Sequence, residues 1–267
     1  MVHVTVTGAA GRMGKSIVGA VRENRQTSLV GALEVADHPA VGKDAGDTAG
    51  ISKVGVKVTT GPERAFKKAD VIIDFSTPEA SLANLEMAVE YGKAMVIGTT
   101  GLSHAQRDRV KDLAREAAVV MAPNMSVGVN LLLKLVEDTA SILGDDYDIE
   151  IVDFHHRHKK DAPSGTALRI AEVAAHALKK DLDKVAVYER KGIIGERGDG
   201  EIGIQTVRAG DIVGDHTVIF AGPGERIELV HRAHSRSTFA SGAVKAAVWV
   251  ANKPAGLYDM QDVLGLK

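Results

Sequence analysis

The first half of the chain alternates short apolar runs with stretches of helical periodicity. Strand-like runs lie at residues 2–6, 29–33, 71–75, 94–97 and 118–122. Apolar residues at helical spacing follow most of them, at 17–21, 82–88 and 110–113. Strands that alternate with helices are typical of a parallel sheet covered on both faces. We therefore predict an α/β fold with a Rossmann-like, doubly wound parallel sheet.

From about residue 127 the pattern changes. A helical stretch at 131–136, a strand near Ile149 and a long helix from Thr166 lead into strand-like runs at 201–207, 217–220 and 226–230. No helix separates these last runs, which predicts a second α+β domain with an open, mostly antiparallel or mixed sheet. Such a sheet has an exposed face, so we expect a homo-oligomer that pairs through these strands.

The tail is helical again from Phe239, through Val250, and we expect it to return to the first domain. The predicted organisation is a dinucleotide-binding domain of residues 1–126 and 236–267. A substrate-binding and oligomerisation domain of residues 127–235 is inserted between its two parts.

Composition narrows the classes of function. The chain has 267 residues, a net charge of −2 and 45% hydrophobic residues, so it lacks the basic excess of nucleic-acid-binding proteins. No apolar run approaches 20 residues, and Met1–Val6 resembles a strand rather than a signal peptide, so we expect a cytoplasmic protein with no membrane contact. The absence of cysteine excludes thiolate chemistry, which leaves histidine, lysine, arginine, carboxylates or a bound cofactor.

The first strand leads into glycines at Gly8, Gly11 and Gly14, and a helix follows at once. The spacing is G-x-x-G-x-x-G rather than G-x-G-x-x-G, but the strand, turn and helix are those of a dinucleotide fold. Glu34 ends the second strand, 20 residues after Gly14, where such folds place an acceptor for the adenosine ribose.

Ligands of such sheets bind at the carboxyl ends of the strands, so the loops there, including Ser76–Pro78, should gather around one cofactor. A plain turn is the alternative for Gly98–Gly101. The predicted cofactor-binding residues are Gly8, Ala9, Ala10, Gly11, Arg12, Met13, Glu34, Gly98, Thr99, Thr100, Ala122, Pro123, Asn124 and Met125.

The segment 150–167 carries three histidines and two lysines between a strand and a helix start. Ser164, Gly165 and Thr166 lie where a helix leaves its first N–H groups unpaired, a favourable place for an anion. One interpretation is a solvated basic loop. A second is an active site for a small acid, in which a histidine moves a proton. A third is a histidine metal site, which the adjacent lysines disfavour.

These segments together resemble the 4-hydroxy-tetrahydrodipicolinate (dihydrodipicolinate) reductase family. The resemblance runs nearly end to end and is most specific in His155–Ala167. It also rests on the segments Gly8–Gly14, Asp74–Ser76, Gly98–Gly101, Asn124–Asn130, Val207–Gly214 and Ser235–Ala240.

The resemblance implies a two-domain, tetrameric reductase of the diaminopimelate route to lysine. NADH or NADPH would deliver hydride to a cyclic dicarboxylate, with loss of water. It implies that His155 transfers the proton and that Lys159 is a proton donor and substrate anchor. Substrate binding would fall on His156, Lys159, Ser164, Gly165, Thr166 and Arg236. A structural ion pair is the alternative role for Arg236.

Glu34 favours the free ribose hydroxyl of NADH, and Val35 stands where some family members have an arginine for the phosphate of NADPH. Arg12, Lys15 and His38 are the remaining nearby cations. We therefore expect NADH to be favoured, NADPH to be tolerated and no metal to be needed. Three other functions stay open: a metal-dependent hydrolase, an NADH-sensing regulator, and a dehydrogenase of another amino-acid intermediate.

Overall fold

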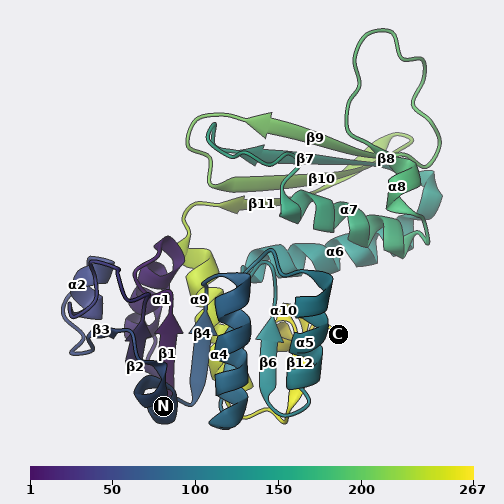
Figure 1. Ribbon diagram of the computed structural model, residues 1–267. Coiled ribbons are helices and arrows are strands. Elements are labelled where there is room, and N and C mark those ends of the chain that lie inside the picture. The colour runs from purple at the N-terminus through teal and green to yellow at the C-terminus, as the bar shows by residue number, and fades with distance from the viewer. The chain divides into compact units, whose positions relative to one another are not determined.

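The computed structural model describes residues 1–267, which form two compact units. Unit 1 comprises Met1–Val127 and Arg236–Lys267, and unit 2 comprises Gly128–Ser235. The last part of the chain therefore belongs to the same unit as the first. Figure 1 labels the elements of both units.

Unit 1 contains a sheet of seven strands that are all parallel, in the order β12-β6-β5-β4-β1-β2-β3. Leaving out β12, this is the strand order of a Rossmann fold, and the order reverses between β1 and β4. The predicted parallel sheet is confirmed. Its strands are β1 (Val2–Thr7), β2 (Thr27–Leu33), β3 (Val58–Thr59), β4 (Val71–Asp74), β5 (Ala94–Ile97), β6 (Ala118–Met121) and β12 (Gly256–Tyr258).

Helices cover both faces of this sheet because its strands are apolar on both sides. Val71 and Ile73 of β4 belong to a core with α1, α9 and α10, whereas Ile72 belongs to a core with α3, α4 and α5. Successive residues of one strand thus enter opposite cores. The helices of unit 1 are α1 (Arg12–Glu23), α2 (Ala45–Ala49), α3 (Pro62–Lys68), α4 (Pro78–Glu90), α5 (His104–Leu113), α9 (Ser237–Val250) and α10 (Met260–Leu264).

The tail differs in detail from its prediction. The helix α9 ends at Val250, and β12 then pairs with β6 as an additional parallel strand. The short apolar run Gly256–Tyr258 is too brief to distinguish a strand from a helix by periodicity.

Unit 2 contains a mixed sheet of five strands in the order β11-β10-β7-β9-β8. The strand β10 is antiparallel to both β11 and β7. On the other side of β7, β9 is parallel to both β7 and β8. The predicted open, mixed sheet is confirmed. The elements are α6 (Val127–Leu143), a 3-10 turn (Gly144–Asp146), β7 (Asp148–His155), α7 (Gly165–Ala177), α8 (Leu182–Val185), β8 (Ala186–Val187), β9 (Ile202–Arg208), β10 (Gly214–Gly222) and β11 (Glu225–Ala233).

One face of this second sheet is buried under α6 and α7. Ile149 and Ile151 of β7 and Phe220 of β10 are buried there, together with Ile170 of α7. The edge strand β11 is mostly exposed, and its Ile227 and Val230 are among the exposed large hydrophobic side chains.

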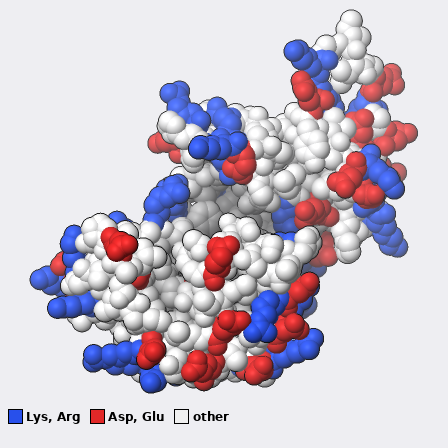
Figure 2. Space-filling model, viewed as in Figure 1, with Lys and Arg blue, Asp and Glu red and all other residues white.

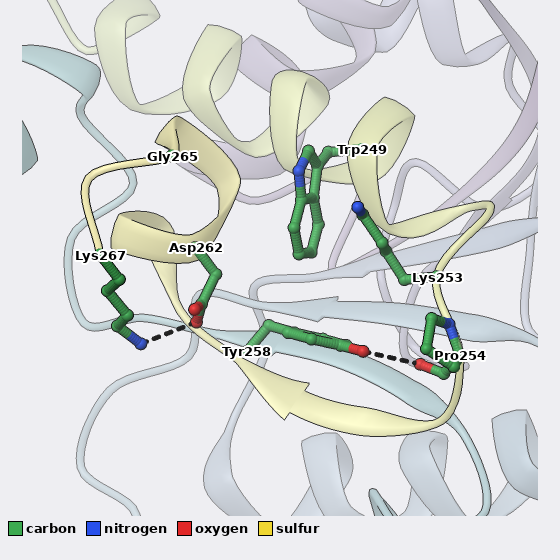
Figure 3. Close-up of a pocket in the computed structure, with 7 residues that line it drawn as sticks. All are labelled: Trp249, Lys253, Pro254, Tyr258, Asp262, Gly265 and Lys267. Carbon is green, nitrogen blue, oxygen red and sulfur yellow. Dashed lines mark hydrogen bonds and ion pairs between the residues drawn. The ribbon is translucent and has the colours of Figure 1, made fainter.

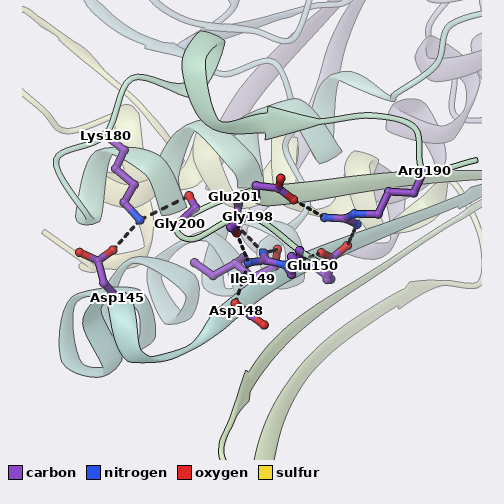
Figure 4. A network of polar contacts seen from close by, with 10 residues as sticks. Asp145, Asp148, Ile149, Glu150, Lys180, Arg190, Gly198, Gly200 and Glu201 are labelled. Atoms are coloured by element: carbon purple, nitrogen blue, oxygen red, sulfur yellow. Dashed lines mark hydrogen bonds and ion pairs between the residues drawn. The ribbon is translucent and has the colours of Figure 1, made fainter. Parts of the chain in front are cut away.

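The long loop between β8 and β9 is attached to β7 by two arginines (Figure 4). Arg190 donates to Glu150 at 2.9 Å and to Glu201 at 3.0 Å, and these carboxylates raise its pKa. Arg197 donates to Asp148 at 2.6 Å. The loop between these two anchors carries exposed Ile193.

None of the helices combines the length and the apolar content that a membrane span requires. On the face seen in Figure 2, basic and acidic side chains alternate over each unit without a broad basic surface. This distribution agrees with the net charge of −2.

Candidate functional site

The strands of unit 1 end in register, which brings the predicted cofactor loops to one sheet edge. Thr7, the last residue of β1, pairs with Leu33 of β2 and with Asp74 of β4. Asp74 pairs with Ile97 of β5, and Ile97 with Met121 of β6. The loops beginning at Gly8, Glu34, Phe75, Gly98 and Ala122 are therefore side by side at the carboxyl ends, where dinucleotide folds bind their ligand.

The glycine loop needs glycine for two separate reasons. Gly8 has a φ of +64°, and a Cβ there would lie 2.6 Å from the carbonyl oxygen of Phe75. At Gly14 a Cβ would lie 2.0 Å from the carbonyl oxygen of Gly8, so only glycine lets the helix pass this close to the turn. Both glycines thus shape the cradle that a pyrophosphate would occupy.

The backbone donors in this loop divide into two groups. The N–H groups of Ala9, Ala10 and Gly11 donate to Leu33, Glu34 and Gly8 respectively. The helix α1 begins at Arg12, and its N-cap Gly11 provides no side-chain acceptor. Because the first N–H groups of a helix have no partner within it, those of Arg12 and Met13 are the better candidates for phosphate binding.

Glu34 lies at the end of β2 and is held against the glycine loop. Its Oε2 accepts a hydrogen bond from the N–H of Ala10 at 3.0 Å, and its Oε1 accepts one from the N–H of Val35 at 3.1 Å. A carboxylate has lone pairs for further donors, so ribose hydroxyls can still bind. The neighbouring Val35 side chain is 67% exposed and offers no charge for a phosphate.

A buried carboxylate that the sequence did not single out for a role organises the same edge. Asp74 is fully buried and accepts hydrogen bonds from hydroxyl and amide groups on four segments of unit 1. The donors are Thr7 Oγ1 at 2.5 Å, Ser76 Oγ at 2.9 Å, Asn84 Nδ2 at 2.7 Å, Thr99 Oγ1 at 2.8 Å and the Ser81 hydroxyl. Asp74 therefore ties the loops after β4 and β5 to β1 and α4.

This network changes what some predicted cofactor residues can contribute. The hydroxyl of Thr99 is committed to Asp74, and the Met125 side chain is 1% exposed within the core of unit 1. Gly98 lies directly under the Phe75 ring, because a Cβ there would be 2.1 Å from Cζ. These three residues are therefore buried at this edge of the sheet. Any contact from Thr99 or Met125 to a cofactor falls to the backbone.

The other predicted loop residues are spread over the same edge. Thr100 and Pro123 are exposed, Ala122 is buried and Asn124 is partly buried. The Asn124 side chain accepts a hydrogen bond from the N–H of Ser126 at 2.9 Å, which holds the turn after β6.

In unit 2, the strand β7 and the helix α7 bring the predicted catalytic residues together. His155 is the last residue of β7, and Gly165 is the first of α7. Ser164 is the N-cap of α7, because its Oγ accepts a hydrogen bond from the N–H of Ala167 at 3.1 Å. Ser164 is 2% exposed and its own N–H donates to Asp153 at 2.9 Å, so its polar groups serve the protein's own structure. The first turn of α7, which begins at Gly165, is therefore the helix start beside this cluster.

Asp153 lies at the centre of this cluster and is fully buried. Its Oδ1 faces two histidines, His155 Nδ1 at 2.8 Å and His216 Nε2 at 3.4 Å. Its Oδ2 accepts from the N–H of Ser164 and from Arg208 Nη2 at 3.2 Å. Burial raises the pKa of Asp153, but the contacts with His155, His216 and Ser164 outweigh it and hold the pKa well below its ordinary range.

Lys159 is connected to Asp153 through Asp161 and Arg208. Its Nζ forms an ion pair with Asp161 Oδ2 at 2.9 Å, which lowers the pKa of Asp161. Arg208 donates to the carbonyl oxygen of Asp161 at 2.7 Å and so connects that turn to Asp153. The Lys159 side chain is 21% exposed, which allows it to reach a ligand.

His156 follows His155 in sequence but differs from it in its surroundings. It is partly buried, and its ring centroid is 6.2 Å from that of exposed His158. Of the three neighbouring histidines, His155 is therefore the one placed against a buried carboxylate.

Asp153, His155 and His216 also offer three ligand atoms within 4.8 Å of one another, the spacing of a metal site. The guanidinium of Arg208, 3.2 Å from the same carboxylate, disfavours a cation there. The residues fit a proton-transfer cluster better than a metal centre, and the expectation that no metal is needed stays a prediction.

Arg236, the remaining predicted substrate residue, belongs to unit 1. It is exposed and is the N-cap residue of α9. Its predicted role in substrate binding stays a prediction.

A separate surface pocket lies in unit 1, between α9, β12 and α10 (Figure 3). Lys253 Nζ stands 4.3 Å from the centroid of the Trp249 ring, and Lys267 pairs with Asp262 at 2.8 Å. None of the predicted cofactor or substrate residues lines it. It plays no part in the proposed chemistry.

Comparisons with known proteins identify the family. The chain matches the models "Dihydrodipicolinate reductase, N-terminus" over residues 2–125 and "Dihydrodipicolinate reductase, C-terminus" over residues 128–264. The chain belongs to the dihydrodipicolinate reductase family. It is accordingly an NAD(P)H-dependent oxidoreductase with a Rossmann-type nucleotide domain.

Curated relatives match over the whole chain. Proteins from Citrifermentans bemidjiense and Syntrophotalea carbinolica, both named 4-hydroxy-tetrahydrodipicolinate reductase, are each 55% identical over 267 residues, which is 100% of both chains. A solved structure described as dipicolinate-bound dihydrodipicolinate reductase from Paenisporosarcina sp. TG-14 aligns with a TM-score of 0.77 at 26% identity, covering 98% of each chain. A putative myo-inositol dehydrogenase from Sinorhizobium meliloti shares the fold alone, with a TM-score of 0.61 at 16% identity.

Proposed function

We propose that the chain reduces 4-hydroxy-tetrahydrodipicolinate to tetrahydrodipicolinate, the activity for which its relatives are named, with His155 as the proton donor. The observation that carries the assignment of the donor is the position of His155. His155 is the last residue of β7 and lies beside the start of α7. Its Nδ1 is 2.8 Å from the buried carboxylate of Asp153. Of the nearby histidines, only His155 and His216 contact this carboxylate, and His216 is 3% exposed and so closed to a substrate.

The reaction consumes one hydride, one proton and one substrate, and releases water. The reduced nicotinamide supplies the hydride when it is bound. The electron pair left on the ring after hydride arrival accepts a proton, which we assign to His155 Nε2, because Nδ1 faces Asp153. General acid catalysis of this kind accelerates a reaction about 10²- to 10⁴-fold.

The substrate carries two carboxylates, and unit 2 offers complementary groups. Lys159 provides a positive charge, and the N–H groups at Gly165 and Thr166 stand at the positive end of the α7 dipole. We assign His156 and Arg236 to the same binding role. The related Paenisporosarcina structure is described as dipicolinate-bound, and dipicolinate is a ring with two carboxylates, which supports this class of ligand.

For the cofactor we propose that NADH is favoured and NADPH tolerated. Glu34 places a negative charge where a ribose phosphate would lie, and exposed Val35 adds no compensating cation. The exposed Arg12 is the nearby cation that would give NADPH some affinity, whereas His38 Nδ1 already accepts a hydrogen bond from the N–H of Ala40. A higher kcat/KM with NADPH than with NADH would contradict this assignment.

We further propose a homotetramer formed through the sheet of unit 2. The open edge strand β11 and its exposed Ile227 and Val230 support pairing with another copy. Light scattering at micromolar concentration that shows only monomer would refute it.

The decisive experiment follows the absorbance of the reduced nicotinamide with freshly generated 4-hydroxy-tetrahydrodipicolinate, with and without a chelator. His155→Gln is compared with wild type and with His158→Gln, an exposed neighbour that serves as the matched control. We expect chelator-insensitive turnover, a kcat that falls about 10²-fold or more in His155→Gln, and little change in KM.

Other outcomes point elsewhere. Unchanged kcat in His155→Gln would remove the proton role. Loss of turnover with chelator would favour the metal-dependent alternative. NADH binding without turnover of this substrate would favour a sensor or a dehydrogenase of another intermediate.

A further inference from the structure

Asp153 contacts the catalytic cluster through both of its carboxylate oxygens. Oδ1 lies 2.8 Å from His155 Nδ1 and 3.4 Å from His216 Nε2. Oδ2 accepts from the N–H of Ser164 at 2.9 Å and from Arg208 at 3.2 Å. One oxygen thus faces the proton donor, and the other fixes the start of the anion-binding helix.

We propose that Asp153 is a positioning residue that holds His155 with Nδ1 turned inward and Nε2 directed to donate the proton. This inference rests on the proposed role of His155. A carboxylate beside an imidazole favours the protonated ring and selects which nitrogen faces outward. Because Asp153 is fully buried, its charge is poorly screened by water, and its contact with His155 is correspondingly strong.

The surroundings keep Asp153 ionised while it does this. Arg208 adds a positive charge on the Oδ2 side, and the N–H of Ser164 adds a donor at the α7 start. His216 lies on β10, in register with Asp153, and its ring centroid is 5.4 Å from that of His155 and 6.4 Å from that of His231. The His155 ring therefore has a carboxylate on one side and a second histidine on another.

The packing around the ring supports the same assignment. Gly214 begins β10, and a Cβ at this position would lie 2.9 Å from His155 Nε2. A side chain at residue 214 would therefore require the His155 ring to shift. This close approach provides a way to displace the ring without touching the charge of Asp153.

The same carboxylate also reaches Lys159 indirectly. Arg208 binds Asp153 and the carbonyl oxygen of Asp161, and the carboxylate of Asp161 pairs with Lys159. Removing the charge of Asp153 should therefore affect substrate binding as well as proton transfer. A fall in kcat would report the effect on proton transfer, and a rise in KM would report the effect on substrate binding.

The first test is Asp153→Asn, which keeps the shape of the side chain and an acceptor for Ser164. We expect kcat to fall about tenfold or more, as part of the 10²- to 10⁴-fold that general acid catalysis provides. The pH profile of kcat should change as well, because the charge beside the proton donor is removed. Asp153→Glu, which restores the charge, should return the pH profile toward that of wild type.

A double variant shows whether Asp153 acts through His155. In a His155→Gln background, Asp153→Asn should change kcat by less than about twofold, although KM can still rise. A further large loss of kcat in the double variant would overturn the proposal, as would an unchanged kcat and pH profile in a folded Asp153→Asn protein. If His155→Gln alone leaves kcat unchanged, the proposed function fails first, which distinguishes the two failures.

Gly214→Ala keeps the proposal testable if Asp153→Asn does not fold, as judged by circular dichroism. The added methyl group would require the His155 ring to shift from its present position against Asp153, while the contacts of Asp153 with Ser164 and Arg208 stay in place. We expect a smaller loss of kcat, about threefold or more, together with a changed pH profile. Wild-type kcat and pH dependence in Gly214→Ala would contradict the positioning role.

Discussion

Each unit contains one fully buried carboxylate at its functional end, and their surroundings differ in kind. Asp74 of unit 1 is surrounded by neutral donors, which are the hydroxyls of threonine and serine and the amide of Asn84. Asp153 of unit 2 is surrounded by groups that carry or change charge, which are His155, His216 and Arg208. Hydroxyl and amide donors stay neutral over the physiological pH range, so they can fix the shape of a loop without a change of charge.

This difference suits the two networks to different tasks, cofactor binding in unit 1 and proton transfer in unit 2. Asp74 connects loops whose backbone has to meet a cofactor, and a network without titrating partners keeps that shape over a wide pH range. Asp153 connects a strand to a helix start through histidines, so its network responds to protonation. We infer that unit 1 determines cofactor affinity and unit 2 determines the pH dependence of turnover.

Among the substitutions that test this division of roles, Asp74→Asn is expected to have the largest effect. The change leaves several buried donors without their charged acceptor, and hydrogen bonds to charged groups contribute about 1.5–3 kcal/mol each. We expect the Kd for NADH, measured by titration of nicotinamide fluorescence, to rise about tenfold to hundredfold. The pH profile of kcat should not move.

Asp153→Asn is the matched control for that measurement, since it is the same substitution in the other unit. It should leave the Kd for NADH within about twofold of the wild-type value. A shift of the pH profile in Asp74→Asn, or a weakened NADH affinity in Asp153→Asn, would show that the two networks do not divide the work in this way.

Lys159→Ala tests whether unit 2 carries the substrate. We expect the KM for 4-hydroxy-tetrahydrodipicolinate to rise about tenfold and kcat to fall, because a charge that meets a carboxylate is lost beside the reacting ring. Lys160→Ala is the control, since Lys160 is the exposed neighbour in the same segment. An unaffected KM in Lys159→Ala would count against carboxylate anchoring.

Acid sensitivity should also differ between the units. The pKa of Asp153 is lowered in the folded state, so its stabilising effect is present above the unfolded pKa of about 3.9 and is lost as the pH falls toward the folded pKa. Between about pH 5 and pH 3 this group should cost about 1 kcal/mol of stability.

Urea unfolding at these two pH values measures that loss. Fluorescence of Trp249, the single tryptophan, follows unit 1, and circular dichroism follows both units. Asp153→Asn should lose less stability on acidification than wild type. Equal losses in the two proteins would exclude Asp153 as the cause.

Val35→Arg is expected to have the smallest effect. An arginine after Glu34 would offer a phosphate a charge-assisted contact, so the ratio of kcat/KM for NADPH over NADH should rise about three- to tenfold. Val35→Lys gives the point charge without the forked geometry and should raise the ratio less. No change in the ratio would mean that the adenosine end does not lie beside residue 35.

Much of the fold of unit 1 could be predicted because local periodicity and parallel pairing agree. The runs that became β4, β5 and β6 are largely apolar on both faces, and only a sheet covered on both sides can bury them. The short elements α2 and β3 were not predicted, because five- and two-residue segments carry too little periodicity. The mixed sheet of unit 2 followed from strand-like runs with no helices between them.

The sequence predicted residues of the candidate site but not the hydrogen bonds and ion pairs that join them. The sequence predicted a strand that leads into the histidines and a helix from Thr166. In the structure the strand ends at His155, and the helix begins at Gly165 with Ser164 as its N-cap. It also proposed Thr99 and Met125 as cofactor residues, although their side chains point into the hydrogen-bond network and the core. Spacing along the chain reports which loop a residue occupies, not the direction of its side chain.

The sequence by itself determined the Rossmann-like strand pattern, the glycine turn, the helix start at Ser164 and the family. Each of these is recognised from short segments, and within each segment the informative residues lie within a few positions of one another. Only the tertiary structure decided that Asp74 joins Thr7 to Thr99 and that Asp153 joins His155 to Arg208. Such contacts depend on which strands become neighbours and in which register. That choice is made when the whole core is buried, because a buried carboxylate is stable only where donors from distant segments converge on it.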